Sequence, residues 1–165
     1  MNDSKDINSY MNFLGSKAKE AAKGLSQAST IKKNEALISI SKSISSRKKD
    51  ILDANSLDLK NAEDQGIGDA LLDRLKLTEE RIDAMISGIN EVIKLKDPIG
   101  EVIEMDPTSS GIKVSKMRVP LGVVGIVYES RPNVTADAAA LCLKSGNAVI
   151  LRGGSEAILS NKIIS

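Results

Sequence analysis

Two short apolar segments on either side of a helical stretch constrain the fold more than any other feature of the sequence. Residues 121–128 (LGVVGIVY) and 148–151 (AVIL) are almost continuously apolar, as strands are when a sheet buries both of their faces. The stretch 136–144 between them is typical of a helix, and a second helix is expected at 156–164. The order strand, helix, strand, helix predicts a βαβ unit of a doubly wound parallel sheet.

The residues before this unit are expected to be helical. From residue 7 to residue 96, apolar side chains recur at helical spacing, although serines weaken the middle of the stripe at 31–52. Thr78 is expected to cap the last of these helices, because two glutamates follow it in the first turn. Asp97-Pro98 should stop that helix. The many lysines of this region are interpreted as a solvated face.

The period of the pattern changes after this proline. Residues 101–105 and 112–119 alternate apolar and polar, and turn-forming residues fill 106–111 between them. This arrangement predicts a β-hairpin with one solvated face.

The predicted fold class is therefore α/β, in three parts. Residues 1–99 form a helical part, residues 100–119 a β-hairpin, and residues 120–165 the start of a Rossmann-like domain. Because two parallel strands do not make a stable sheet, the sheet is expected to be incomplete and the chain to be the front part of a larger protein.

The composition excludes several kinds of site from these residues. With no histidine and a single cysteine, the chain cannot supply a Ser-His-Asp or Cys-His pair or a zinc cage, and no metal site is expected. That cysteine, Cys142, is interpreted as a small buried hydrophobe of a helix. A net charge of +1 and 2% aromatic residues give no basis for binding nucleic acid. Without a signal-peptide core or a bilayer-length apolar run, no membrane association and a cytoplasmic location are expected.

The turn after the second predicted strand is the first candidate for ligand binding. Arg152-Gly153-Gly154-Ser155 stands at the strand end where ligands bind open α/β sheets. Free amides at the start of the next helix attract anions, glycines let a ligand approach the backbone, and Arg152 can hold a phosphate. Ser155 is expected to cap that helix. The alternative is a solvated arginine beside an ordinary turn, since glycine-rich turns are common.

The loop after the first predicted strand should lie at the same edge of the sheet. Ser130 and Arg131 are candidates for binding the substrate, since an arginine can clamp a phosphate or a carboxylate. Asn133 offers an amide donor that could polarise a carbonyl. The alternative role for Asn133, or for Thr135, is to cap the helix that follows.

Two segments carry a resemblance to a known family. Residues 118–135 (RVPLGVVGIVYESRPNVT) and 144–156 (KSGNAVILRGGSE) resemble the aldehyde dehydrogenase superfamily, and within it most closely the gamma-glutamyl phosphate reductases. The stretches YESRPN and LRGGSE are the specific parts, and Asp73-Arg74-Leu75 in the helical region also fits that family. The resemblance implies an aldehyde-dehydrogenase-like fold whose hairpin serves as an oligomerisation arm, so that the complete protein is a homo-oligomer.

The resemblance also implies a reaction. Members of the family reduce L-glutamate 5-phosphate with NADPH to L-glutamate 5-semialdehyde and phosphate, the second step of proline biosynthesis from glutamate. Their nucleophilic cysteine is expected downstream of Ser165 and not at Cys142, so the catalytic domain is absent and this chain alone should be inactive. Two alternatives are the reductase part of a bifunctional pyrroline-5-carboxylate synthase, which the lack of a kinase-like segment disfavours, and a non-catalytic nucleotide-binding module.

Site residues are carried over by position. Arg152 stands where many members have a lysine that contacts the adenosine ribose, and Ser155 stands near the glutamate of NAD-preferring members. Both differences favour a 2′-phosphate and hence NADPH. The expected cofactor-binding residues are Arg152, Gly153, Gly154, Ser155 and Glu156. Asn133 is the candidate for the superfamily's oxyanion asparagine, and Arg131 is the alternative occupant of that site as a substrate anion clamp.

Overall fold

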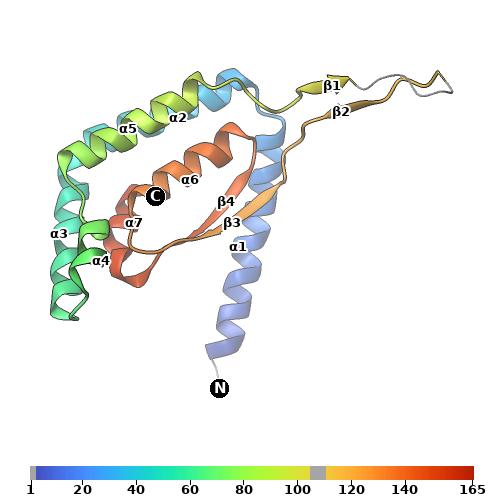
Figure 1. The fold of residues 1–165 in the computed structure, drawn as a ribbon. Helices are drawn as coiled ribbons and strands as arrows, with labels where there is room; N and C mark the ends of the chain where they lie inside the picture. Colours follow the sequence, from blue (N-terminus) through green and yellow to red (C-terminus); the bar gives the residue numbers. More distant parts are fainter. Residues whose placement is uncertain (1–2, 105–110) are drawn as a thin grey trace.

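The computed structural model describes residues 3–104 and 111–165, and it has the α/β architecture that the sequence predicts (Figure 1). The helices of the first part are α1 (Asp3–Ser26), α2 (Thr30–Ser46), α3 (Lys48–Asp64), α4 (Asp69–Leu75) and α5 (Glu79–Lys94). They are followed by β1 (Val102–Glu104), β2 (Ser115–Met117), β3 (Val123–Val127), α6 (Asn133–Lys144), β4 (Ala148–Arg152), the short 3-10 helix η1 (Ser155–Ala157) and α7 (Ile158–Ile164).

Side-chain caps and turns set the ends of the helices in the first part. The hydroxyl of Thr78 accepts a hydrogen bond from the backbone N–H of Arg81 at 3.2 Å, which confirms the predicted cap of α5. The stripe at 31–52 is two helices rather than one, because the backbone turns at Arg47 between α2 and α3. The Arg47 N–H still reaches the carbonyls of Ser43 and Ile44 in α2, so this donor stays paired at the break.

The main core lies where α2, α5 and α6 pack together. In Figure 1, α2 and α5 run side by side along one edge of the molecule, and α6 lies beneath them. The buried side chains of this core are Leu37, Ile44, Ile51, Leu77, Ile82, Met85, Ile89, Ala136 and Ala140. Each fully buried leucine or isoleucine contributes roughly 1.5–3 kcal/mol, so this cluster fixes the start of α6 against the helical part.

The segment after α5 is a hairpin that extends away from the helices (Figure 1). β1 and β2 pair antiparallel, with Val102 opposite Met117 and Glu104 opposite Ser115, which confirms the predicted hairpin. The prediction of one solvated face is wrong, because Val102 and Ile103 point to opposite faces and are 52% and 47% exposed. Neither face packs on a core. Most of the predicted turn, at 105–110, lies outside the described residues.

The predicted βαβ unit is confirmed. β3 and β4 pair parallel, from Val123 opposite Ala148 to Val127 opposite Arg152, with α6 as the connection. The prediction that both strands are buried on both faces is wrong, since β3 alternates between exposed and half-buried residues and Val127 is 71% exposed. In β4 only Ala148 is fully buried. Among the described elements, α1 and α6 pack mainly on β4, so part of the β3 surface has no cover.

The predicted helix caps after the two strands are wrong. Asn133 is the first residue of α6 and neither it nor Thr135 caps that helix, since Pro132 already has helical dihedral angles as the N-cap residue. Ser155 opens η1 and makes no capping hydrogen bond. Gly146 does end α6 as predicted, because its φ of 69° suits glycine and its N–H bonds to the carbonyl of Leu143.

A buried polar network replaces the missing cap of α7. Both carboxylate oxygens of Asp58, on α3, accept backbone hydrogen bonds, from Leu159 N at 3.2 Å and from Ser160 N at 2.7 Å. Asn55 bonds to Ser160 Oγ at 3.0 Å and to the backbone of Leu75 and Leu77. Two residues of α3 therefore hold α7 and the α4–α5 connection in one arrangement.

A second buried network involves Lys33, which the sequence places on a solvated face, and Lys144 at the end of α6. The Lys33 side chain is 2% exposed, and its ammonium lies 2.6 Å from Asp97 Oδ2, which also accepts from Thr30 Oγ1 at 2.8 Å. Lys144 donates to Asn34 Oδ1 and to the carbonyl of Ile93. The solvated-face interpretation is wrong for Lys33, because its ammonium has a carboxylate partner inside the protein.

Candidate functional site

The two turns that leave the carboxyl edge of the parallel sheet are tied together. The backbone N–H and the hydroxyl of Ser130 both donate to Glu156 Oε1, at 2.6 and 2.8 Å. Burial alone would raise the pKa of Glu156, but these hydrogen bonds and its own backbone bond lower the pKa below its ordinary value. The predicted neighbourhood of the two turns is confirmed, and an ionised carboxylate bridges them.

This bridge changes the interpretation of two predicted ligand-binding residues. Ser130 is buried, and its backbone has a positive φ of 44°, a conformation that side chains rarely adopt. Its hydroxyl serves Glu156 rather than the pocket described below. Glu156 in turn faces Ser130, so its negative charge is already compensated by two donors.

The packing of the protein itself favours glycine at positions 153 and 154, because a larger residue would have to displace a neighbouring side chain. A Cβ atom at Gly153 would overlap the amide of Asn161, and one at Gly154 would overlap the carboxylate of Glu156. Asn161 is held in place because its Oδ1 accepts from the hydroxyl of Thr135 at 3.0 Å. The two glycines therefore have an internal reason beside the ligand approach that the sequence suggests.

Two of the amides at the start of α7, where the sequence predicts free donors, are already taken within the protein. The carboxylate of Asp58 already accepts from the N–H groups of Leu159 and Ser160. The cation of the turn remains available, because the Arg152 side chain is exposed and makes no ion pair within the described part of the chain. Ser155 is exposed beside it.

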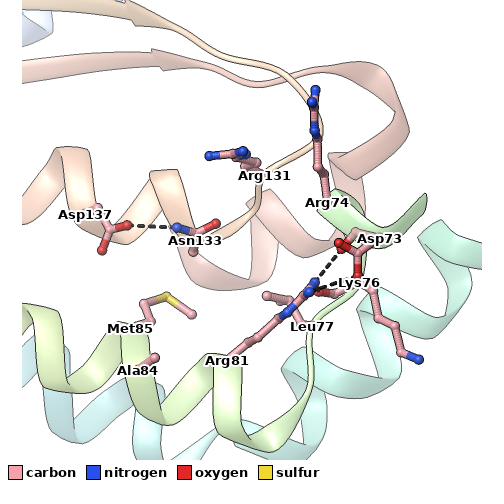
Figure 2. Close-up of a pocket in the computed structure, with 10 residues that line it drawn as sticks. All are labelled: Asp73, Arg74, Lys76, Leu77, Arg81, Ala84, Met85, Arg131, Asn133 and Asp137. Atoms are coloured by element: carbon pink, nitrogen blue, oxygen red, sulfur yellow. Dashed lines mark hydrogen bonds and ion pairs between the residues drawn. The ribbon is translucent and has the colours of Figure 1, made fainter. Parts of the chain in front are cut away.

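A cavity of about 360 Å³ lies next to the loop at 129–132 (Figure 2). The α4–α5 connection, α5 and the start of α6 surround it. Its lining residues are Asp73, Arg74, Lys76, Leu77, Arg81, Ala84, Met85, Arg131, Asn133 and Asp137. The structure thus brings two of the predicted site residues, Arg131 and Asn133, into one cavity, while Ser130, Arg152 and Ser155 lie outside its lining.

Cations dominate the lining of this cavity. Arg81 is engaged, since it pairs with Asp73 Oδ1 at 2.9 Å and donates to the carbonyls of Asp73 and Lys76. Arg74, Lys76 and Arg131 form no ion pair with any described residue. Arg81 therefore braces the end of α4, which carries Arg74, and the connection after it, which carries Lys76, and the cavity can receive an anion.

Besides Asp73, which pairs with Arg81, a second acid, Asp137, lines the same cavity. Asn133 Nδ2 donates to Asp137 Oδ2 at 2.9 Å, a contact between the first and second turns of α6. Burial raises the pKa of Asp137, and the hydrogen bond from Asn133 opposes this rise only in part. Asp137 forms no ion pair with the residues of 3–104 and 111–165.

Comparisons with known proteins show what the chain is similar to. No family model matches the chain. A gamma-glutamyl phosphate reductase of Halothermothrix orenii is 51% identical over 160 residues, covering 97% of this chain and 38% of the relative, and one of Clostridium perfringens (strain ATCC 13124) is 56% identical over 155 residues, covering 94% and 37%. The chain matches the N-terminal portion of gamma-glutamyl phosphate reductases. It spans little more than a third of the length of these relatives.

Solved structures agree with the sequence matches. The crystal structure of gamma-glutamyl phosphate reductase from Thermotoga maritima has a TM-score of 0.85 and 47% identity, covering 90% of this chain and 36% of that one. The crystal structure of gamma-glutamyl phosphate reductase from Saccharomyces cerevisiae has a TM-score of 0.82 and 34% identity, and the match covers 89% of this chain and 38% of that one. A Bacillus subtilis structure assigned to the aldehyde dehydrogenases has a TM-score of 0.64 at 17% identity, and the match covers 89% of this chain and 30% of that one. At this identity the likeness supports the fold alone. The predicted resemblance and fold class are confirmed.

Five charged residues of this cavity, Asp73 among them, escape the sequence analysis. Arg74, Lys76 and Arg81 lie about fifty positions before Arg131, and no local pattern connects the two stretches. The only signal is that Asp73-Arg74-Leu75 fits the gamma-glutamyl phosphate reductases. Asp137 is hidden in a different way, since a single acid among alanines looks like an ordinary helix residue.

The single cysteine of the chain is placed as predicted. Cys142 is 7% exposed, and burial raises the pKa of its thiol, so the thiol stays protonated at neutral pH. No described helix is both long and apolar enough to span a membrane. Among the described residues, no three cysteines or acids gather as metal ligands do.

Proposed function

We propose that this chain is the N-terminal part of an NADPH-dependent gamma-glutamyl phosphate reductase. The complete protein reduces L-glutamate 5-phosphate to L-glutamate 5-semialdehyde and phosphate, in the synthesis of proline from glutamate. The observation that carries this proposal is that Arg74, Lys76 and Arg131, which have no counter-ions in the described chain, line one cavity beside the carboxyl edge of the sheet. The names of the relatives support the same reaction.

The chemistry of the substrate fits this cavity. An acyl phosphate of glutamate carries a phosphate and an α-carboxylate, and a guanidinium binds either anion through two parallel hydrogen bonds. Arg131 follows β3 directly, so it reaches the cavity from the sheet side. The Asn133 amide has a second N–H beside the one given to Asp137, and this donor can stabilise negative charge on the acyl oxygen. The nucleophilic cysteine is provided by a part of the protein beyond these residues.

The residues around Arg152 fit a nicotinamide cofactor with a 2′-phosphate. When bound, NADPH supplies the hydride that reduces the acyl group. Arg152 is exposed and unpaired in the described chain, and Ser155 beside it is uncharged. Glu156, the acid that would repel a phosphate, faces Ser130 instead. The turn therefore presents a positive charge and no free negative one.

Replacing Arg152 by alanine in the complete protein should weaken the binding of NADPH and leave the binding of NADH nearly unchanged. One charge-assisted hydrogen bond is worth about 1.5–3 kcal/mol, so the KM for NADPH should rise about 10- to 100-fold, while the KM for NADH changes little. Steady-state rates with each cofactor would measure the two values. Equal changes for both cofactors would show that Arg152 does not read the 2′-phosphate.

The function itself is tested by comparing this chain with the complete reading frame. We expect glutamyl phosphate to be reduced, with phosphate release and NADPH oxidation, by the complete protein and not by the 165-residue chain. A Cys142→Ala variant of the complete protein should retain wild-type kcat, because the Cys142 thiol is buried within α6. Loss of turnover with normal folding in this variant would contradict the placement of the nucleophile elsewhere. Cofactor binding without turnover in any form would indicate a non-catalytic module.

Assembly of the complete protein as a homo-oligomer through the hairpin belongs to the same proposal. Val102, Ile103 and Met117 expose apolar surface on both faces of β1 and β2, away from the core. An arm of this kind buries such surface only against another chain or domain.

A further inference from the structure

The position of Asp137 is the feature that the proposed function leaves unexplained. Its carboxyl lines a cavity whose other charged groups are mainly cations, and an anionic substrate would be repelled by it. Its one hydrogen bond within the described residues comes from Asn133. A carboxylate accepts several hydrogen bonds, so most of its acceptor capacity remains open.

The charges of the cavity are separated in space. In Figure 2, Asp137 lies at one side of the cavity and Arg74 and Lys76 at the other, with Arg131 and Asn133 between them. Asp137 therefore marks one end, and the free cations lie at the other, where the second acid, Asp73, is already paired with Arg81. A ligand that carries a positive group at one end and negative groups elsewhere matches this order.

We propose that Asp137 binds the α-ammonium group of the substrate, so that the cavity selects α-amino acid derivatives over their des-amino analogues. The inference rests on the proposed function and adds to it the group that distinguishes a glutamyl from a glutaryl chain. The ammonium is compact and carries several donors, which suits a carboxylate with open acceptor positions. Arg131 and the cations of the α4–α5 connection are left for the carboxylate and phosphate.

The half-buried state of Asp137 supports this role. Desolvation raises the pKa of its carboxyl, and no described cation pairs with it. A ligand ammonium would supply the missing partner and favour the ionised form. An alternative role is purely positional, since Asp137 also holds the amide of Asn133. The two roles differ in what they predict for substrates without the amino group.

The test uses the complete protein and the reverse reaction. Aldehyde, inorganic phosphate and NADP+ give the acyl phosphate, NADPH and a proton, and NADPH formation is followed by absorbance. The probes are L-glutamate 5-semialdehyde and 5-oxopentanoate, which lacks only the amino group, at equal concentrations of free aldehyde because the amino aldehyde cyclises. We expect the wild type to prefer the semialdehyde at least about tenfold in kcat/KM.

Asp137→Asn should remove this preference. The kcat/KM for L-glutamate 5-semialdehyde should fall about 10- to 100-fold, while the value for 5-oxopentanoate should change less than about twofold. Asp137→Glu should restore part of the preference. The matched control is Asp64→Asn, an exposed acid on α3, which should leave both values unchanged.

The possible outcomes distinguish failure of the inference about Asp137 from failure of the proposed function. Equal losses for both aldehydes in Asp137→Asn would overturn the inference and assign Asp137 the role of positioning Asn133. A wild type that uses both aldehydes equally would overturn it without any variant. A wild type that converts neither aldehyde would instead overturn the proposed function.

Discussion

Replacing Asp97 by alanine should lower the free energy of unfolding by about 3–5 kcal/mol at neutral pH. Removing one partner of a buried ion pair leaves the other charge buried and uncompensated, which is the costly case. Here the remaining charge is the Lys33 ammonium, whose side chain is 2% exposed. A second ammonium, that of Lys144, lies in the same buried network, where Lys33 donates to the Lys144 carbonyl and Lys144 donates to the Ile93 carbonyl. Urea denaturation of the complete protein, followed by circular dichroism, measures the change.

Two comparisons make this prediction specific. Asp83→Ala removes the partner of Lys48 in an exposed pair, and it should cost less than about 1 kcal/mol. Burial tends to raise the pKa of Asp97, but hydrogen bonds from Lys33, Ile99 and Thr30 lower the pKa below its ordinary value. Because the folded pKa is the lower one, the stabilisation is complete above the unfolded pKa of about 3.9 and is lost as pH falls further. A difference between wild type and Asp97→Ala that does not narrow in acid would contradict the ion-pair explanation.

Replacing Arg131 by alanine in the complete protein should lower kcat/KM for glutamyl phosphate at least about 100-fold. A bidentate contact with a phosphate or carboxylate has two charge-assisted hydrogen bonds of about 1.5–3 kcal/mol each. Arg131 is exposed and makes no ion pair among the described residues, so the stability of the fold should change by less than about 0.5 kcal/mol. Phosphate release at low substrate concentration measures the loss.

Arg131→Lys should recover only part of the activity, because lysine keeps the charge and loses the planar pair of donors. Lys60→Ala removes an exposed cation from α3 and serves as the control for a change in net charge. A wild-type kcat/KM in Arg131→Ala would remove Arg131 from the substrate site and leave the anion to Arg74 and Lys76.

Local signals in the sequence were sufficient for most of the helices and for the βαβ unit. Thr78 caps α5 as predicted because its partner, the N–H of Arg81, lies only three residues away. Gly146 ends α6 for a similar reason, since a positive φ is a property of one residue. The break at Arg47 carries no such signal, because neither glycine nor proline marks it.

The features that the sequence did not reveal depend on partners far along the chain. Ser155 looked like the cap of the last helix, but two amides at the start of α7 are satisfied by Asp58, about a hundred residues earlier. Glu156 looked like a cofactor contact, and it binds Ser130 across the sheet edge. The prediction that both faces of β3 are buried was wrong. An apolar composition shows that a strand can be buried, but it does not show whether another element is present to cover it.

The bond between Asp58 and Ser160 also says something about the order in which the fold is completed. The two residues are separated by 102 positions, whereas Asn55 meets the carbonyl of Leu75 across only 20. Helices α3 and α4 can thus dock early, while α7 gains its cap only after a long loop has closed. The entropy of that closure grows with the logarithm of loop length, and each doubling adds only about 0.6 kcal/mol. The hairpin lies inside this loop, so its length can vary with little effect on how firmly α7 is held.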